Sequence, residues 1–334
     1  MRETLLRSTA GRTAVCLILL LLLLFAMLLS IQYGALDLSL TEIVKILWNR
    51  NPRVAYQILY NVRIPRVLLG ALAGGSLAVS GAILQGVMRN PLAAPGIIGI
   101  SSGGGLSGIL VMLVFPQFSH LLVPSAFCGA LLTAMLVYLL AWKRGVNPIR
   151  LILAGVAFSS MLGAFSSAIL LFNAEKAGSV LEFSIGSLSA RSWEHIHLAG
   201  WYMLGAFPLA FAMGNKLNIL ELGDETAIGL GMKTERVRFC LIALSALLAA
   251  SAVSVVGLLG FVGLIAPHIV RIIIGPDNRF LLPASALAGG FIVVSCDTLG
   301  RVLMKSSELP VGIIMALLGP PFFLWLLRRH SYES

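Results

Sequence analysis

This sequence has few charged residues. Only 11% of its 334 residues are Asp, Glu, Lys or Arg, whereas about a quarter is usual for a soluble domain. Hydrophobic residues make up 58% of the chain, which excludes a water-soluble globule and a disordered segment. The apolar stretches are continuous rather than alternating, which argues against a transmembrane β-barrel. The composition therefore predicts an all-α, polytopic integral membrane protein.

Residue combinations that carry chemistry are also missing. The sequence has no Ser-His-Asp set, no paired carboxylates and no Cys-x-x-Cys, and its four cysteines lack metal-ligand spacing. The segment nearest to a phosphate-binding loop, Gly231-Met232-Lys233-Thr234, has the wrong residue before its lysine and fails the spacing upstream. We therefore expect no catalytic, cofactor or metal residue, and any ATP-driven work requires a separate subunit. Scattered basic residues also argue against nucleic acid as a partner.

Long stretches free of charged residues set the number of membrane spans. They cover 13–36, 67–88, 90–142, 151–174, 195–215, 239–270, 280–296 and 309–327. One span needs about 20 apolar residues, so 90–142 must hold two helices with a turn near Pro116. The stretch 239–270 breaks at Gly257 and Gly260 and is read as two spans. The total is about ten transmembrane helices.

The lysines and arginines indicate an orientation. With a cytoplasmic N-terminus, ten spans return the C-terminus to the cytoplasm, and most basic residues then lie on the cytoplasmic side. The expected location is thus a plasma membrane, crossed several times. No ionisable residue lies at the middle of a span, which disfavours a proton- or sodium-coupled carrier. A carrier or channel that needs no partner nevertheless stays an alternative, as does a membrane-embedded enzyme.

The largest polar segment between spans contains a short predicted helix. Gly223 or Asp224 can begin it, Asp224 and Glu225 suit its positive end, and Gly231 can close it. Ala227, Ile228 and Leu230 form a small apolar patch. The segment is either a capped turn between two spans or a helix that inserts into a cytosolic partner.

Arginines at the opposite side of the membrane need an explanation. Arg63 and Arg66 open the second span, and Arg301 lies four residues after Asp297, so this last pair shares one helical face. These arginines either anchor the helices at the membrane surface or form a docking surface for acidic residues of an extracytoplasmic partner.

Several motifs resemble the FecCD-type family, the permeases of iron–siderophore, haem and cobalamin ABC importers. They are Arg63-Ile64-Pro65-Arg66, Ser80-Gly81 with Gln85, Asn90 to Gly96, Gly223 to Gly231, Gly260 to Arg271, Asp297 with Arg301, Glu308 to Gly312, and Gly319 to Phe322. Together they extend from about residue 60 to the end of the chain.

The resemblance implies a type II ABC importer permease fold, with residues 1–334 as a single transmembrane permease domain in a prokaryotic inner membrane. The implied partners, besides membrane lipids, are cytosolic ABC ATPase subunits, an extracytoplasmic substrate-binding protein and a second permease in a homo- or heterodimer. The implied coupling helix to the ATPase spans 223–231, with Gly223, Asp224, Glu225, Ala227, Leu230 and Gly231. The implied docking residues are Arg63, Arg66 and Arg301. Span 151–173 and the glycine-rich part of 67–86 are expected to border the path of an iron–siderophore or related chelate.

Overall fold

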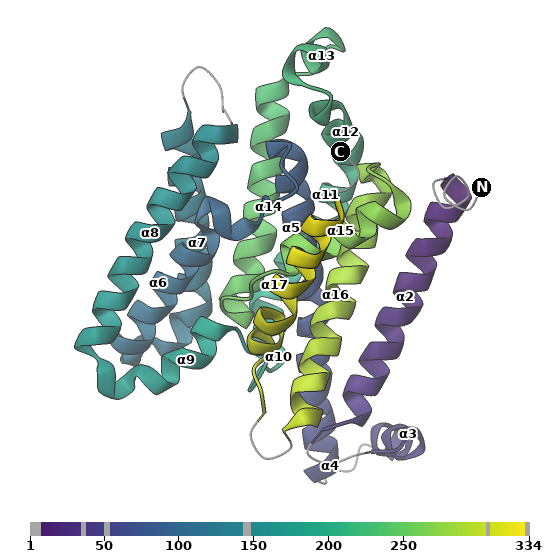
Figure 1. The fold of residues 1–334 in the computed structure, drawn as a ribbon. Coiled ribbons are helices and arrows are strands. Elements are labelled where there is room, and N and C mark those ends of the chain that lie inside the picture. Colours follow the sequence, from purple (N-terminus) through teal and green to yellow (C-terminus); the bar gives the residue numbers. More distant parts are fainter. Residues whose placement is uncertain (1–7, 35–37, 50–53, 143–147, 305–307, 331–334) are drawn as a thin grey trace.

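The computed structural model describes residues 8–34, 38–49, 54–142, 148–304 and 308–330, which form a helical bundle (Figure 1). The main helices are α2 (Thr9–Gln32), α5 (Ile64–Met88), α6 (Ile100–Leu113), α7 (Leu122–Ala141), α8 (Pro148–Phe172), α11 (Trp201–Ala212), α14 (Thr234–Val256), α15 (Val262–Ile274), α16 (Asn278–Leu303) and α17 (Val311–His330). Short helices join them: α3 (Leu40–Asn49), α4 (Val54–Gln57), η1 (Ile58–Arg63), η2 (Pro95–Ile98), η3 (Pro116–Leu121), η4 (Ala174–Lys176), α9 (Ala177–Ile185), α10 (Trp193–His195), η5 (Ile196–Gly200), α12 (Gly214–Glu221) and α13 (Asp224–Gly229). The predicted all-α class is confirmed.

The helices account for the predicted spans. Six of them are long and apolar enough to cross a membrane. The pair formed by 193–212 and α12, bent by 53°, passes the same test only when its two helices are taken together. The helices α6, α15 and α17 are apolar but contribute shorter apolar stretches to the described chain. Each of the ten predicted spans therefore contains a main helix, but within the described residues only six of them, or seven with the bent pair, have the length and hydropathy of a membrane span. The predicted break is also confirmed, because α14 ends at Val256 and Gly257 follows with a φ of +82°.

Helix α5 is the centre of the bundle. It packs against α16, α14 and α15, and 83% of its most apolar window is buried. Small residues permit these contacts: Gly74 lies against the backbone of Gly289, and Gly81 lies against that of Gly263. Close backbone approach of this kind replaces the hydrophobic effect as the source of helix association in lipid. The prediction that the glycine-rich part of α5 borders a path is wrong, because that part is enclosed within the subunit.

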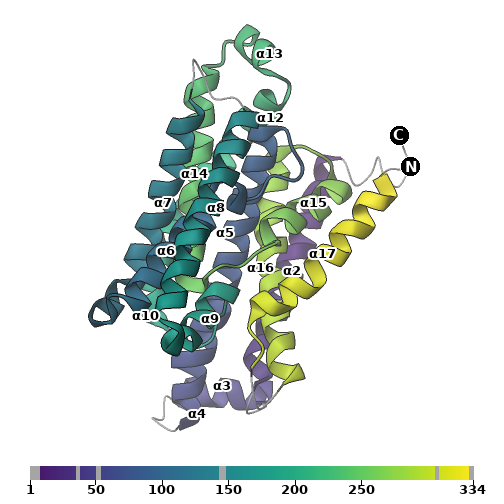
Figure 2. The same cartoon turned by 60° about the vertical axis from the view of Figure 1, so that its left-hand side comes forward.

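Helices α2 and α8 lie at the periphery. Only 22% of the apolar window of α2 and 11% of that of α8 is buried. The exposed side chains of α8 are large and apolar, with Leu153, Phe165 and Phe172 between 56% and 84% exposed. In Figure 2, α13 stands beyond the ends of α12 and α14, while α3 and α4 lie across the opposite end of the bundle. The two ends therefore present different structures.

Candidate functional site

Helix α13 begins and ends as its glycines predict. Gly223 precedes it with a φ of +113°, a conformation that costs a glycine little. At the other end, Met232 N–H donates to the Ala227 carbonyl at 3.0 Å and Gly231 N–H donates to that of Ile228 at 2.8 Å. With Gly231 at a φ of +80°, these bonds make a Schellman motif. The predicted short helix in the 223–231 segment is confirmed as a structure.

An ionic cluster fixes α13 to the ends of two core helices. Arg238, at the start of α14, donates from Nη2 to both carboxylate oxygens of Asp224, at 2.8 and 2.9 Å. Its Nη1 donates to Glu235 at 2.6 Å, and its side chain is 1% exposed. Arg89 pairs with Asp224 as well, from a φ of +47° directly after α5. Asp224 therefore does more than favour the positive end of a short helix: it joins α13 to α5 and α14.

The apolar patch on α13 differs from the prediction. Ile228 and Leu230 are 61% and 62% exposed, as a docking helix requires. Ala227 is fully buried, because it packs inside the turn that α13 makes with its neighbours. Of the three residues predicted to form the patch, Ile228 and Leu230 are exposed as expected, and the prediction for Ala227 is wrong. Glu225 is exposed on the same short helix.

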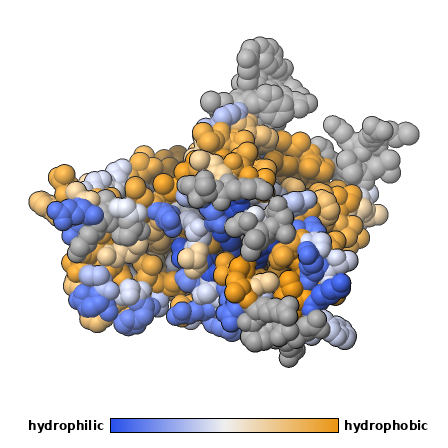
Figure 3. Space-filling view, turned by 90° about the horizontal axis from the view of Figure 1, so that it is seen from below, coloured by the Kyte–Doolittle hydropathy of each residue, from blue (hydrophilic) through white to orange (hydrophobic). Residues whose placement is uncertain are grey.

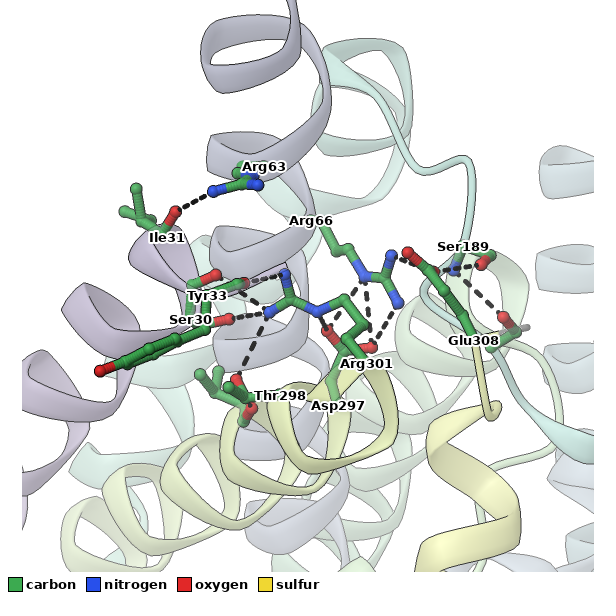
Figure 4. Close-up of polar contacts among 12 residues, drawn as sticks. Ser30, Ile31, Tyr33, Arg63, Arg66, Ser189, Asp297, Thr298, Arg301 and Glu308 are labelled. Atoms are coloured by element: carbon green, nitrogen blue, oxygen red, sulfur yellow. Dashed lines mark hydrogen bonds and ion pairs between the residues drawn. The ribbon is translucent and has the colours of Figure 1, made fainter. Parts of the chain in front are cut away.

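The three predicted docking arginines converge at the opposite end of the bundle (Figure 4). Arg66 holds Asp297 through Nε and Nη2, at 3.0 and 2.9 Å, and donates from Nη1 to Glu308 at 2.7 Å. Arg301 Nε lies 3.2 Å from the second oxygen of Asp297, which confirms the predicted pairing along one helical face. Glu308 also accepts a hydrogen bond from Ser189 at 3.1 Å. We call these residues, with Arg63, the Asp297 cluster.

Two of these arginines also close the end of helix α2. Arg63 donates to the carbonyls of Ile31 and Gln32 at 2.7 and 3.1 Å, and Arg301 donates to that of Ser30 at 3.0 Å. Carbonyls of the last helical turn have no partner within the helix and carry partial negative charge, so a guanidinium group stabilises them. This capping of α2 is a structural role that the sequence did not reveal.

The burial of the three arginines determines how the Asp297 cluster can interact with a partner. Arg63, Arg66 and Arg301 are 4% to 6% exposed, so they are not the open docking surface that their positions in the sequence suggested. Three guanidinium groups face two carboxylates, and this leaves the cluster positive. The three arginines and Glu308 also line a small cavity of about 130 Å³. Hydrophilic residues gather across this end of the molecule, between hydrophobic flanks (Figure 3).

A third ionic contact, which the sequence did not predict, lies at the α13 end. Asp277 precedes α16 and accepts hydrogen bonds from Arg12 on α2 at 2.8 Å, from Asn218 on α12 at 2.8 Å and from Arg279 at 2.7 Å. The hydrogen bonds from Arg279 foremost, and that from Asn218, hold the pKa of the Asp277 carboxyl well below its ordinary value. The turn residues Gly275 and Pro276 followed by Asp are a helix-start signal that could have revealed it.

Comparisons with known proteins agree with this architecture. The chain is 42% identical to the Fe(3+)-citrate import system permease protein YfmE of Bacillus subtilis, covering 95% of this chain and 96% of that protein. It is 40% identical to the hemin transport system permease protein HmuU of Yersinia pestis, covering 94% and 95%. A solved ABC transporter assigned to the metal-chelate type, in an inward-facing conformation, matches with a TM-score of 0.84 and 32% identity over 95% of this chain and 99% of that chain. The profile of the FecCD transport family matches residues 21–329, and the chain therefore belongs to the FecCD transport family.

Proposed function

We propose that this chain is the permease subunit of an ATP-driven importer and that it carries an iron chelate. The relatives named above import ferric citrate and hemin, which are both iron bound to a carboxylate-bearing organic ligand. The observation that carries the proposal is α13, a helix held outside the bundle by the ion pairs of Asp224 with its apolar residues exposed. A helix in this position can bind a partner subunit and pass the movement of that partner to the core helices.

The exposed apolar residues of α13 are the basis for the proposed ATPase partner. Ile228 and Leu230 suit a hydrophobic groove on a cytosolic subunit, since exposed apolar side chains of this size gain free energy when they are buried. Asp224 would pass the displacement to Arg238 on α14 and to Arg89 at the end of α5. In this proposal the α13 end faces the cytoplasm, together with the N-terminal end of α2.

The substrate-binding protein is assigned to the end that carries the Asp297 cluster. The excess guanidinium charge there gives a positive field, which steers an acidic surface toward this end even though the arginines are largely buried. Glu308 is the cluster member with the greatest exposure, with 40% of its side chain accessible, so an arriving carboxylate competes with Glu308 for Arg66.

A second permease subunit would complete the path. The large apolar side chains along α8 have few contacts within this chain and suit either lipid or the surface of a second permease. We assign them to a dimer interface that borders the path. A homodimer and a heterodimer both satisfy this arrangement.

Reconstitution tests the proposal. The permease is purified with the ATPase that copurifies from its host and is placed in proteoliposomes together with the substrate-binding protein. ATP-dependent uptake of ferric citrate and of hemin is then measured. Ile228→Asp should abolish ATPase copurification and uptake, since it would place a charge in an apolar groove. Ile228→Leu, the control, should retain both.

The outcomes separate the alternatives. Uptake that needs no ATP would show a carrier or channel instead of an ABC importer. Uptake by Ile228→Asp equal to that of the parent would refute the assignment of α13 but not that of the importer. If neither chelate accumulates in vesicles that hold an active ATPase and the binding protein, the proposed substrate class is wrong.

A further inference from the structure

An apolar groove runs along the outside of the bundle between α7 and α14. These helices lie against each other, and their ends nearest α13 frame two recesses of about 570 and 270 Å³. The recesses share Tyr138, Leu139 and Phe239. The smaller one continues along α7 to Leu131, about 12 Å from Leu139 at the rise of an α-helix. The groove thus has an apolar lining and is long enough for part of an acyl chain.

The groove contains a polar atom that lacks a partner. Tyr138 is 5% exposed, and its hydroxyl makes no hydrogen bond with any of the described residues. Its ring lies between those of Trp142 and Phe239, with centroids 5.7 and 5.4 Å away. A buried hydroxyl without a hydrogen bond is costly, so a polar group of a ligand at this point would stabilise the site.

A positive charge stands at the mouth of the groove. Arg236 lines the larger recess, is exposed, and forms no ion pair within the described part of the chain. The neighbouring carboxylate, Glu235, is already paired with Arg238. Trp142 is 47% exposed at the same mouth and has the amphipathic ring found at the boundary between the hydrocarbon core and the headgroups.

We propose that the α7–α14 groove binds an anionic phospholipid, with one acyl chain along Leu131, Leu139 and Phe239 and the phosphate between Arg236 and Tyr138. The groove opens sideways from a membrane-spanning bundle, so lipid rather than water meets it. The unpaired guanidinium selects an anionic headgroup over a zwitterionic one, and the Tyr138 hydroxyl gains an acceptor. This lipid site is separate from the proposed transport function and does not depend on the direction of transport.

Native mass spectrometry of the purified permease tests the site with two probes, dioleoyl phosphatidylglycerol and dioleoyl phosphatidylcholine. We expect the parent protein to retain phosphatidylglycerol in preference to phosphatidylcholine. Arg236→Gln should weaken retention of phosphatidylglycerol about tenfold, because it removes a charge-assisted contact with the phosphate. Tyr138→Phe should weaken it by a smaller factor, and Ala243→Phe should reduce retention of both lipids by filling the slot from α14.

Arg150→Gln is the matched control. Arg150 is an exposed arginine at the start of α8 and does not line either recess, so its loss should leave retention unchanged. Equal retention of the two lipids by the parent protein would overturn the proposal, as would equal effects of Arg236→Gln and Arg150→Gln. Release of the bound lipid on addition of the copurified ATPase would also overturn it, since the groove would then be part of a protein interface.

Discussion

Asp297 neutralises two guanidinium groups at once, those of Arg66 and Arg301. All three side chains are between 3% and 7% exposed, so the charges exist in a medium that solvates them poorly. Without Asp297, the buried Arg301 has no carboxylate partner among the described residues, and Arg66 keeps only the partly exposed Glu308. Removing one member of a buried ion pair in this way is costly. The residue that matters most for folding at this end is therefore the carboxylate and not an arginine.

Asp297→Asn should lower the free energy of unfolding by about 3–5 kcal/mol, because two buried cations lose their shared counter-charge. Thermal unfolding in detergent, followed by tryptophan fluorescence, measures the change. The comparison variant is Glu308→Gln, which removes a carboxylate whose side chain is 40% exposed. An equal loss of stability in the two variants would contradict the burial argument.

The stabilisation given by Asp277 should depend on pH. Its folded-state pKa is depressed, so the contribution is complete above the ordinary pKa of about 4 and is lost as the pH falls toward the folded-state value. Asp277→Asn should therefore lower the unfolding temperature at about pH 6 and have a progressively smaller effect below about pH 4.

The unfolding temperature of both proteins, measured from about pH 6 down to about pH 3, gives the difference directly. Glu225→Gln serves as the control, because it removes an exposed carboxylate and should produce no pH-dependent gap. A gap for Asp277→Asn that widens in acid would show that the sign of the pKa shift is wrong.

At the scale of helices, the packing depends on glycines that allow two backbones to meet. A Cβ added at Gly81 would lie 1.8 Å from the Gly263 carbonyl oxygen, so α5 and α15 would have to separate. Gly163, on α8, has nothing within 4 Å of the same added atom. These two positions differ in packing while both lie inside helices.

Gly81→Ala should destabilise the protein by about 1–3 kcal/mol through overpacking at the α5–α15 contact. Gly163→Ala should be neutral or slightly stabilising, because alanine favours a helix over glycine. The thermal midpoints of the two variants give the comparison. A Gly81→Ala protein as stable as its parent would mean that the two helices do not meet as closely as described.

The sequence predicted the positions of the helices better than it predicted their burial within the subunit. Uncharged stretches located the ten main helices, because the membrane requires continuous apolar length, and six of these are long and apolar enough to span it in the described part of the chain, or seven with the bent pair. Glycines located the break after Val256 and the ends of α13. Burial within the subunit was not predictable from these patterns. A helix that is apolar on all sides has the same sequence pattern whether lipid or protein surrounds it. The enclosed position of α5 was therefore not predicted.

The polar contacts were predicted only where both partners were close in sequence. Asp297 and Arg301, four residues apart, were paired correctly. The contact of Arg66 with Asp297 spans 231 positions, and that of Arg12 with Asp277 spans 265. Contacts over such separations depend on how the helices pack. For the same reason the burial of Ala227 and the capping of α2 by Arg63 could not be read from the sequence.

The whole molecule has two chemically distinct ends, and this allows a test of its orientation. In a background without the native cysteines and without the ATPase, Gly229→Cys places a thiol on α13, and Val54→Cys places one on α4, where Val54 is 74% exposed. A membrane-impermeant maleimide should label Val54→Cys in right-side-out vesicles and Gly229→Cys in inside-out vesicles. The reverse pattern would place α13 outside the cell.

Helix α5 links these two ends by itself. Its 25 residues make a rod of roughly 37 Å, with Arg66 in the Asp297 cluster near its start and Arg89, the partner of Asp224, just after its end. The contact of Gly81 with Gly263 lies between them and leaves no space for sliding. A stiff rod that tilts about an inner point moves its two ends in opposite directions. In the proposed coupling, a displacement of α13 that tilts α5 would therefore move the Asp297 cluster in the opposite direction, through one continuous helix.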